Sequence, residues 1–307
     1  MKRIAVIAFV LLLGACSPTE DEVLGTQVTS SPTPSKTSDP RPPADGDPLL
    51  SFPGPDKRVP TKPGRLAEHV HDTEVKLKKA IAMWLDRGGD RKSPAGRRVA
   101  LGALWQQKML RVLTKRPALA RAVMRKVPNW VATKLDEHVE ANSGLRSLAS
   151  PIEPPVRMRV TPVDPHDKLQ RYYKKAGRRY NIPVEILASL NFVESKFGRF
   201  MGPSSAGALG PMQFMPATWD FYGEGNVWNP HDAIMAAARY LSASGAPDRM
   251  NDALFAYNRS WAYVKAIRTY ATEIKRRPHS YYSYYFHQVF VRTTEGDVQL
   301  TGPGRDQ

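Results

Sequence analysis

The stretch of sequence that most constrains the fold runs from residue 181 to residue 198 and reads NIPVEILASLNFVESKFG. Pro183 is typical of the first turn of a helix, because the amide hydrogen that proline lacks would be unbonded there. Leu187, Leu190 and Phe197 follow at helical spacing, and Glu194 continues the same apolar stripe. The stretch therefore predicts a helix over residues 183–197 with a carboxyl group on its core-facing side.

A carboxyl group in that position is a candidate acid. Burial disfavours the charged form and raises the pKa of a carboxyl group, which is what a general acid working near neutral pH requires. A glutamate near a helix end is also commonly bonded to an arginine or to the backbone. The position of Glu194 alone therefore leaves a catalytic and a structural interpretation open.

Two further segments have the composition of a sugar-binding site. Residues 204–216 read SSAGALGPMQFMP, and their glycines and small side chains would let the backbone approach a ligand closely. Residues 255–258 read FAYN and place an aromatic ring and an amide at a predicted helix end. Hydroxyl and amide groups suit the hydroxyls and N-acetyl groups of sugars. Each segment alone is equally typical of an ordinary turn or cap.

Together, and in this order, the three segments resemble the lytic transglycosylases of the lysozyme-like superfamily, over roughly residues 167–271. Glu194-Ser195 matches the Glu-Ser motif of that family, residues 210–213 match its Gly-x-Met-Gln motif, and residues 256–258 match its Ala-Tyr-Asn motif. The sequence of residues 206–216 is closer to the membrane-bound members, while proline at position 211 leaves the subfamily open. The resemblance implies Glu194 as the catalytic residue and these substrate-binding residues: Ser204, Met212, Gln213, Tyr257 and Asn258.

The resemblance also implies a reaction without water. The glutamate of this family protonates the glycosidic oxygen between N-acetylmuramic acid and N-acetylglucosamine in peptidoglycan, then takes a proton from the muramoyl 6-hydroxyl, which closes a 1,6-anhydro ring. Most glycosidases need two carboxylates. Asp220 and Glu224 are expected to be solvated and Asp232 to begin a helix, so no second candidate is strong. A muramidase that uses water and a non-catalytic cell-wall-binding lipoprotein are the alternatives.

The first residues predict export and a lipid anchor. Lys2 and Arg3 precede an apolar run over residues 4–13, as in a secretory signal. Leu13-Gly14-Ala15-Cys16 resembles the lipobox of bacterial lipoproteins, and Cys16 is the single cysteine of the chain. We therefore expect a lipidated Cys16 that holds the protein on the outer face of the cell membrane, or on an outer membrane. An ordinary cleaved signal with a chance cysteine is the alternative.

The remaining sequence predicts an all-α protein with a small C-terminal β-hairpin. Helical periodicity recurs through residues 66–150 and again after the proline-rich residues 151–165, whereas residues 285–300 alternate as in a hairpin. The tyrosines of residues 281–285 are expected to pack this hairpin rather than to stack sugars. The predicted organisation is a signal peptide (1–15), a disordered Pro/Ser/Thr-rich tether (16–65), a helical accessory segment (66–150) and a lysozyme-like transglycosylase domain (151–307).

The composition indicates the class of partner. A formal charge of +16 over 307 residues attracts polyanions. Because the chain is predicted to be exported, a membrane surface or the cell wall is a better partner than nucleic acid, and the many Arg and Lys residues of the accessory segment form either a solvated face or a wall-binding surface. The seven histidines are scattered, so neither a metal site nor a cofactor is expected.

Overall fold

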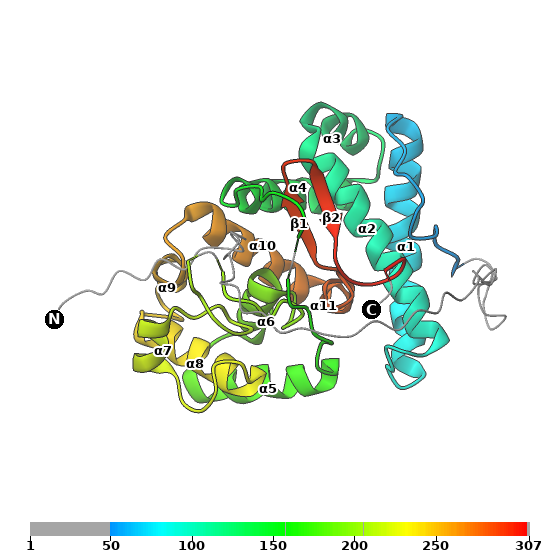
Figure 1. The fold of residues 1–307 in the computed structure, drawn as a ribbon. Coiled ribbons are helices and arrows are strands. Elements are labelled where there is room, and N and C mark those ends of the chain that lie inside the picture. Colours follow the sequence, from blue (N-terminus) through cyan, green and yellow to red (C-terminus); the bar gives the residue numbers. More distant parts are fainter. Residues whose placement is uncertain (1–49, 157, 205, 306–307) are drawn as a thin grey trace, which may run out of the picture.

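The computed structural model describes residues 50–156, 158–204 and 206–305, and within them the predicted all-α fold with one small hairpin is confirmed (Figure 1). Side-chain caps begin several of the helices: the side chains of Ser93 and Asn229 accept hydrogen bonds from Gly96 N and His231 N. The elements are α1 (Pro63–Asp86), α2 (Pro94–Lys115), α3 (Pro117–Met124), α4 (Asn129–Ser147), α5 (His166–Tyr180), α6 (Val184–Ser195), α7 (Pro216–Tyr222), α8 (Pro230–Ala243), α9 (Met250–Tyr257), α10 (Trp261–Arg276), α11 (His279–Tyr285), β1 (Phe290–Thr293) and β2 (Gly296–Gln299).

The hairpin is shorter than predicted. Strands β1 and β2 pair antiparallel, with Val291 opposite Val298, whereas residues 279–285 form α11. Tyr281, Tyr284 and Tyr285 are spaced three and four residues apart, which places them on one face of a helix, and all three are buried. The prediction that they pack was correct, but they pack in the helical core and not against the hairpin.

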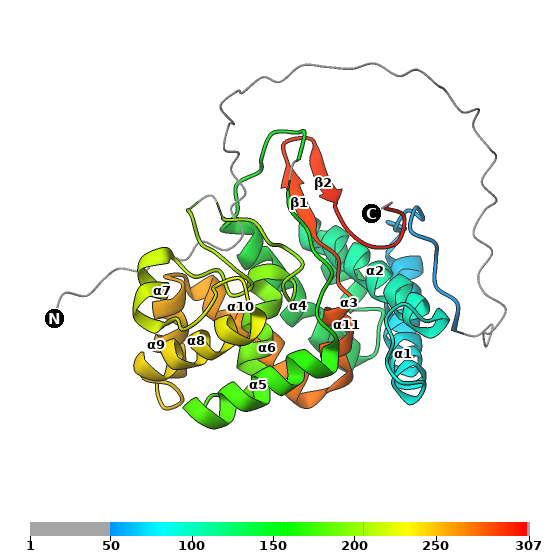
Figure 2. The ribbon, with the colours of Figure 1, turned by 60° about the horizontal axis from the view of Figure 1, so that its bottom comes forward.

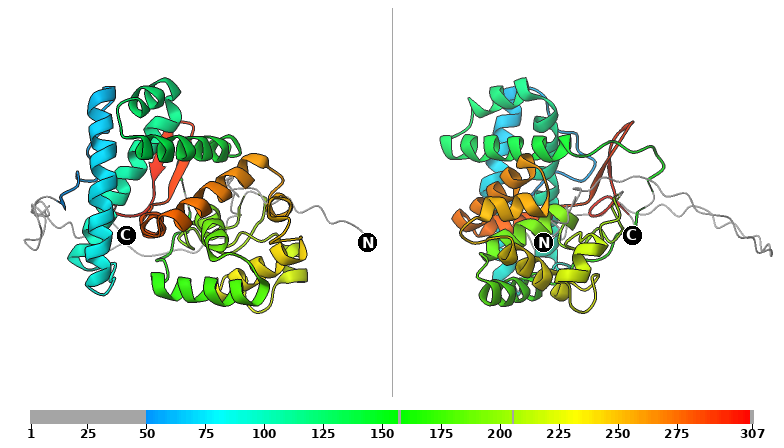
Figure 3. Two further views of the ribbon diagram at one scale, coloured as in Figure 1. Left: turned by 180° about the vertical axis from the view of Figure 1, so that it is seen from behind. Right: turned by 90° about the vertical axis from the view of Figure 1, so that its left-hand side faces the viewer.

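The accessory helices share a core with the rest of the protein. Trp84 of α1 is fully buried, and its ring contacts the rings of His166, Tyr282 and Phe286. The largest apolar cluster joins residues of α1, α2 and α4 with residues of α5 to α11, and a smaller cluster lies among α1 to α4 alone. Figure 3 shows α1 and α2 lying directly against the remaining helices. The boundary at residue 150 stays a prediction, since the core crosses it.

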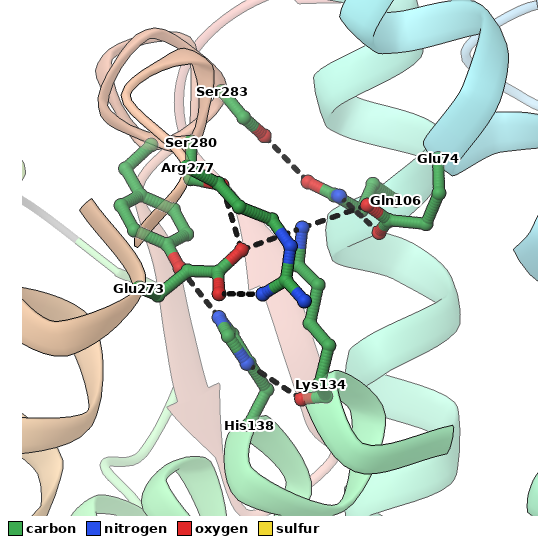
Figure 4. A network of polar contacts seen from close by, with 9 residues as sticks. Glu74, Gln106, Lys134, His138, Glu273, Arg277, Ser280 and Ser283 are labelled. Carbon is green, nitrogen blue, oxygen red and sulfur yellow. Dashed lines mark hydrogen bonds and ion pairs between the residues drawn. The ribbon is translucent and has the colours of Figure 1, made fainter. Parts of the chain in front are cut away.

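A buried polar network also crosses this boundary (Figure 4). Lys134 Nζ of α4 lies 2.7 Å from Glu74 Oε2 of α1 and 3.2 Å from Glu273 Oε1 of α10. Arg277 completes the group with an ion pair of 2.5 Å to the second oxygen of Glu273. Because Lys134 and Glu273 are almost fully buried, each charge depends on its partners for compensation.

The predicted tether ends earlier than residue 65. Helix α1 starts at Pro63, and residues 50–62 lie along α2. A Cβ on Gly102 would come within 2.7 Å of the ring of Phe52, so this ring rests on the backbone of α2, and Lys108 Nζ donates to the carbonyl oxygens of residues 55 and 57. The predicted signal peptide, Cys16 and tether up to residue 49 lie outside the described residues. No helix in the described ranges is long and apolar enough to cross a membrane.

The hairpin and the segment of residues 150–156 and 158–163 project together from one face of the helical body (Figures 2 and 3). Ile152 N donates to Arg292 O over 3.0 Å, which joins this segment to β1. Further along, Thr161 N donates to Arg199 O over 2.9 Å, so the same segment is bonded to the loop that leaves α6. This ribbon therefore connects the hairpin with the end of the helix that carries Glu194.

Candidate active site

Helix α6 is buried on all sides, and not only along the predicted stripe. Every residue from Ile186 to Ser195 is buried, because α5, α8, α10 and α11 all contact the helix. The helix ends at Ser195 rather than at Phe197, since Lys196 and Phe197 adopt left-handed φ angles of 54° and 62°. Such angles are uncommon outside glycine and occur often at functional sites. The turn after Glu194 is therefore held in place by its surroundings.

Glu194 lies at the centre of this helical body with no exposed surface. Its Oε1 accepts a hydrogen bond of 2.5 Å from the hydroxyl of Tyr263, whereas Oε2 is buried without a partner among the described residues. Burial raises the pKa of Glu194 to about 8, although the hydrogen bond from Tyr263 and the charge of Lys196 act in the opposite direction. The carboxyl group is therefore mostly protonated at neutral pH, as a general acid must be.

Tyr263 is the main site residue that the sequence analysis missed. It lies in the first turn of α10, where its amide donates to the Oγ of the capping residue Ser260 over 3.3 Å. Tyr263, Ile267, Tyr270 and Ile274 share the buried face of α10, so the helical spacing could have identified it as a core residue but not as a partner of Glu194. Burial and the nearby Glu194 raise the pKa of Tyr263 well above its ordinary value, which keeps its hydroxyl a donor.

Lys196 places a positive charge close to the carboxyl group. Its Nζ donates to Phe192 O over 3.0 Å and lies 4.3 Å from the centre of the Phe192 ring. Burial lowers the pKa of Lys196 to about 8, with a further decrease from the charge of Arg111. The ammonium group therefore favours the ionised form of Glu194, and it stabilises the carboxylate that remains after Glu194 has donated its proton.

The loop that contains the Gly-x-Met-Gln motif is bonded to α6 and α9 through its carbonyl oxygens. Pro211 O accepts from Asn191 Nδ2 over 2.9 Å and from Ser195 Oγ over 2.6 Å. Met212 O accepts from the hydroxyl of Tyr257 over 2.7 Å. The Glu-Ser and Ala-Tyr-Asn motifs thus hold the third motif in position, and Ser195 acts on the backbone rather than on a ligand.

The same loop requires a glycine and leaves one side-chain acceptor free. Gly210 has a φ of +74°, and a Cβ there would lie 2.0 Å from Val227 O. Gln213 has a φ of 49°; its Nε2 donates to Gly210 O over 2.9 Å, while its Oε1 is buried without a partner among the described residues. Gln213 Oε1 therefore lacks a donor among the described residues, and Glu194 Oε2, the oxygen that is not bonded to Tyr263, lacks a partner there as well.

The structure brings Tyr257 close enough to Glu194 for the charge of Glu194 to contribute to the raised pKa of Tyr257. The hydroxyl of Tyr257 in turn bonds the carbonyl of Met212, the residue before Gln213. Ser204 instead bonds within its own loop, where its Oγ accepts from Ala208 N over 3.0 Å. Asn258 is buried directly after α9. Among the predicted binding residues, Ser204 thus has a structural partner for its hydroxyl.

None of the three weaker carboxylate candidates makes a described contact with Glu194. Glu224 is exposed and forms an ion pair with Arg239. Asp232 accepts from Asn226 N over 3.0 Å and from the ring of the residue before it. Asp220 is exposed on α7. Within the residues that the structure describes, no three His, Asp or Glu side chains gather as metal ligands would.

The comparison with known families agrees with this geometry. Residues 171–278 match the family model of the transglycosylase SLT domain, a range that includes Glu194, the loop at 210–213 and Tyr263. No solved structure is significantly similar to the chain. The chain therefore carries an SLT-type transglycosylase domain of the lysozyme-like superfamily, a lytic transglycosylase domain that acts on peptidoglycan.

Proposed function

We propose that the protein cleaves the β-1,4 bond between N-acetylmuramic acid and N-acetylglucosamine and leaves a 1,6-anhydro-N-acetylmuramoyl end, with Glu194 as both acid and base. The observation that carries this proposal is the buried carboxyl group, whose pKa is raised to about 8 and whose Oε2 has no partner among the described residues. A buried, protonated carboxyl group with a free oxygen can donate to a bound glycosidic oxygen.

The proton balance needs only one carboxyl group. Protonated Glu194 gives its proton to the glycosidic oxygen, the bond from that oxygen to C1 of the muramoyl residue breaks, and N-acetylglucosamine leaves with the proton on its O4. The carboxylate then takes the proton of the muramoyl 6-hydroxyl, whose oxygen forms a bond to C1. Glu194 is protonated again at the end, and no water is consumed.

The surroundings of Glu194 support its two roles in different ways. The hydrogen bond from Tyr263 orients Oε1 and leaves Oε2 for the substrate. Lys196 favours the carboxylate that exists between the two proton transfers. Both groups lie on elements whose backbone is fixed by packing, which is the condition for preorganised catalysis.

For the substrate-binding residues, the contacts support a division of roles. Gln213 Oε1 is a free acceptor for an N–H or O–H of a sugar. Met212 and Tyr257 shape the wall around Glu194, because the carbonyl of one is bonded to the hydroxyl of the other. Ser204 holds Ala208 through a hydrogen bond within its own loop, and Asn258 lies at the end of α9 beside Tyr257.

A muramidase would break the same bond with an activated water molecule. Activation of water by a second carboxylate has no support from Asp220, Glu224 or Asp232, which bond elsewhere or are exposed. The intact and buried Glu194 also favours turnover over a non-catalytic cell-wall-binding role. Both alternatives are outcomes of the experiment below.

We also propose that the protein is exported and anchored through a lipid on Cys16. The support is the signal-like residues 1–13 and the lipobox-like residues 13–16. Mass spectrometry of the mature N-terminus tests this proposal, since lipidation adds the mass of the acyl groups to Cys16. A Cys16→Ser variant should then be found in the soluble fraction.

The test of the reaction is a digest of purified peptidoglycan with residues 17–307, which contain the whole chain after the proposed lipidation site. Products are separated and read by mass, because an anhydro end is lighter than a reducing end by one water molecule. Anhydro products from the wild type, and none from Glu194→Gln, support the proposal. Glu185→Gln, on the same helix, is the matched control and should stay active.

Reducing ends in place of anhydro ends would assign the muramidase reaction. Full activity of Glu194→Gln would refute the assigned role of this residue. Binding of the wild type to peptidoglycan without any release of fragments would assign the non-catalytic role.

A further inference from the structure

A pocket lies between the end of α5, the end of α7 and the first turns of α8. It encloses about 220 Å³ and is lined by side chains within residues 175–180, 222–224 and 231–239, and we name it the α5–α8 pocket. Figures 1 and 2 show these helices together at one end of the helical body, away from the hairpin. Neither Glu194 nor any predicted substrate-binding residue lines this pocket, so it is separate from the site described above.

The hydroxyl of Tyr180 holds two guanidinium groups together in the pocket. Its oxygen accepts from Arg239 Nε over 3.0 Å and from Arg179 Nε over 3.3 Å. Burial acts to raise the pKa of Tyr180, but these two bonds outweigh it and the pKa is lowered. Because the two bonds occupy both lone pairs of the oxygen, the O–H of Tyr180 remains as a donor, and no described residue accepts from it.

The carboxylates of the pocket are both bonded within it. Glu224 forms an ion pair with Arg239. Asp232 accepts from His231 Nδ1 over 2.9 Å, so the other ring nitrogen of His231 is an acceptor. These two carboxylates therefore already have partners and leave other cations of the pocket without one.

Lys175 and Arg179 are the two cations that form no ion pair with a described carboxylate. Lys175 Nζ donates to His231 Nε2 over 3.1 Å and acts on the charge of Asp232 from a longer distance. The two side chains are exposed and lie four residues apart, on one face of α5. Together with the O–H of Tyr180 they place an ammonium group, a guanidinium group and a hydroxyl at one opening, and these are the donors that bind a carboxylate.

The size and the mixed charge of the pocket fit the end of a longer molecule that carries both a carboxylate and an amine. Its volume is smaller than the about 300–1,000 Å³ of pockets that enclose a whole small ligand. Glu224 and Asp232 would repel a phosphate polymer, which has no positive charge to offer them. Glu224 is exposed and can accept from an ammonium group, whereas Met235 and Ala236 give the wall an apolar part for a short side chain.

We propose that the α5–α8 pocket binds the peptide stems of peptidoglycan through a free carboxylate, which Lys175, Arg179 and Tyr180 hold. Such stems carry carboxylates, a free amine and the methyl side chains of alanine, which match the three kinds of group in the pocket. The buried ring of Tyr240 lies between the rings of Tyr222, in the pocket, and Tyr257. A bound stem would therefore keep the enzyme on the wall without occupying the cleavage site. The proposal rests on peptidoglycan as the substrate of this domain, but not on the anhydro product.

The experiment is a nuclear magnetic resonance titration of residues 17–307 with the tetrapeptide stem freed from purified peptidoglycan, followed at the Nε–H signals of the arginines. Two further ligands are the same peptide with amidated carboxylates, and inorganic phosphate. The test variant combines Lys175→Gln with Arg179→Gln. The matched control combines Lys174→Gln with Arg178→Gln, which removes the same charge from two exposed residues of α5 that have no described side-chain partner.

The free peptide should shift the Nε signals of Arg179 and Arg239 in the wild type, and the amidated peptide should not. Because an exposed ion pair strengthens binding by at most about fivefold, loss of both cations should weaken peptide binding by about tenfold, while the control variant keeps the wild-type affinity.

Three outcomes would overturn the proposal. They are wild-type signals that do not respond to the free peptide, equal binding of the free and amidated peptides, and equal weakening in the test and control variants. A response to phosphate but not to the peptide would overturn it as well and assign the pocket to a phosphate. The peptide contains no glycosidic bond, so none of these outcomes depends on the cleavage reaction.

Discussion

Replacing Tyr263 with Phe is expected to move the alkaline limb of the pH–rate profile to higher pH. The substitution removes one hydroxyl, whose described partner is Oε1 of Glu194 at 2.5 Å. This hydrogen bond favours the charged form of Glu194 and so opposes the effect of burial. Without this hydrogen bond, the protonated form of Glu194 becomes more stable relative to the ionised form, and the pKa of Glu194 rises further.

The size of the shift can be worked from the geometry. A hydrogen bond to a charged group contributes about 1.5–3 kcal/mol, and about 1.4 kcal/mol corresponds to one pKa unit. The apparent pKa of Glu194, raised to about 8 in the wild type, should therefore rise by about one to two units in the variant. The rate at neutral pH should fall at the same time, because Oε1 loses the group that orients it.

The assay follows initial rates of anhydro-product release from a soluble glycan strand across the pH range. Tyr270→Phe is the matched control, because Tyr270 is a buried tyrosine of the same helix whose hydroxyl bonds Asn142 instead. Its alkaline limb should not move. If the limb of Tyr263→Phe stays in place or moves to lower pH, then either Glu194 is not the acid that sets it or the hydroxyl does not donate to it.

Three further changes test other parts of the structure. Glu194→Gln should stabilise the fold by about 3 kcal/mol at pH 7, as measured by urea unfolding, and the gain should grow as pH rises from about 4.5 to about 8. The reason is that the pKa of Glu194 is raised in the folded state, so that charging this carboxyl group destabilises the fold. Lys134→Met should cost about 3–5 kcal/mol in the same measurement, since it leaves the carboxylate of Glu74 without a compensating charge and with only its hydrogen bond from Gln106. Gly210→Ala should lower cleavage at least about tenfold with an unchanged circular dichroism spectrum, because its Cβ would collide with Val227 O and displace the motif loop.

Each of these changes has a control in the same chain. Glu185→Gln should show no gain in stability at alkaline pH. Lys265→Met breaks the exposed ion pair with Glu140 and should cost less than about 1 kcal/mol. Gly207→Ala introduces a Cβ that meets no atom within 4 Å, so only the strain of its φ of +84° remains. A control that changes as much as its test variant would contradict the explanation given for that variant.

The sequence was sufficient to predict features that depend on a single helix. Pro183 and the spacing of Leu187, Leu190 and Glu194 predicted a helix with a buried carboxyl group, and α6 carries Glu194 with no exposed surface. The helix end was predicted two residues too far, because the left-handed turn at Lys196 is not a preference of these residue types. The surrounding bonds impose that turn, among them Ser195 Oγ to Gly198 N.

Signals that depend on distant partners were not accessible from one sequence. Tyr263 and Glu194 are 69 positions apart, and only the packing of α10 on α6 makes them neighbours. The contact between Phe52 and Gly102 could not be predicted either, because a single aromatic residue in a proline-rich segment gives no periodic pattern. Composition alone therefore predicted disorder for residues that in fact lie along α2.

The support of the catalytic helix extends into the accessory helices. His138 of α4 bonds the hydroxyl of Tyr284, and the ring of Tyr284 stacks on Phe192 of α6 with centres 4.9 Å apart. Phe192 lies two residues before Glu194, and its ring also contacts the ammonium group of Lys196. Because aromatic stacks and buried hydrogen bonds fix the position of their partners, displacement of α4 would move the back of α6. The accessory helices therefore form part of the structure that holds Glu194 in place, and a chain cut at residue 151 would lose that support together with part of its core.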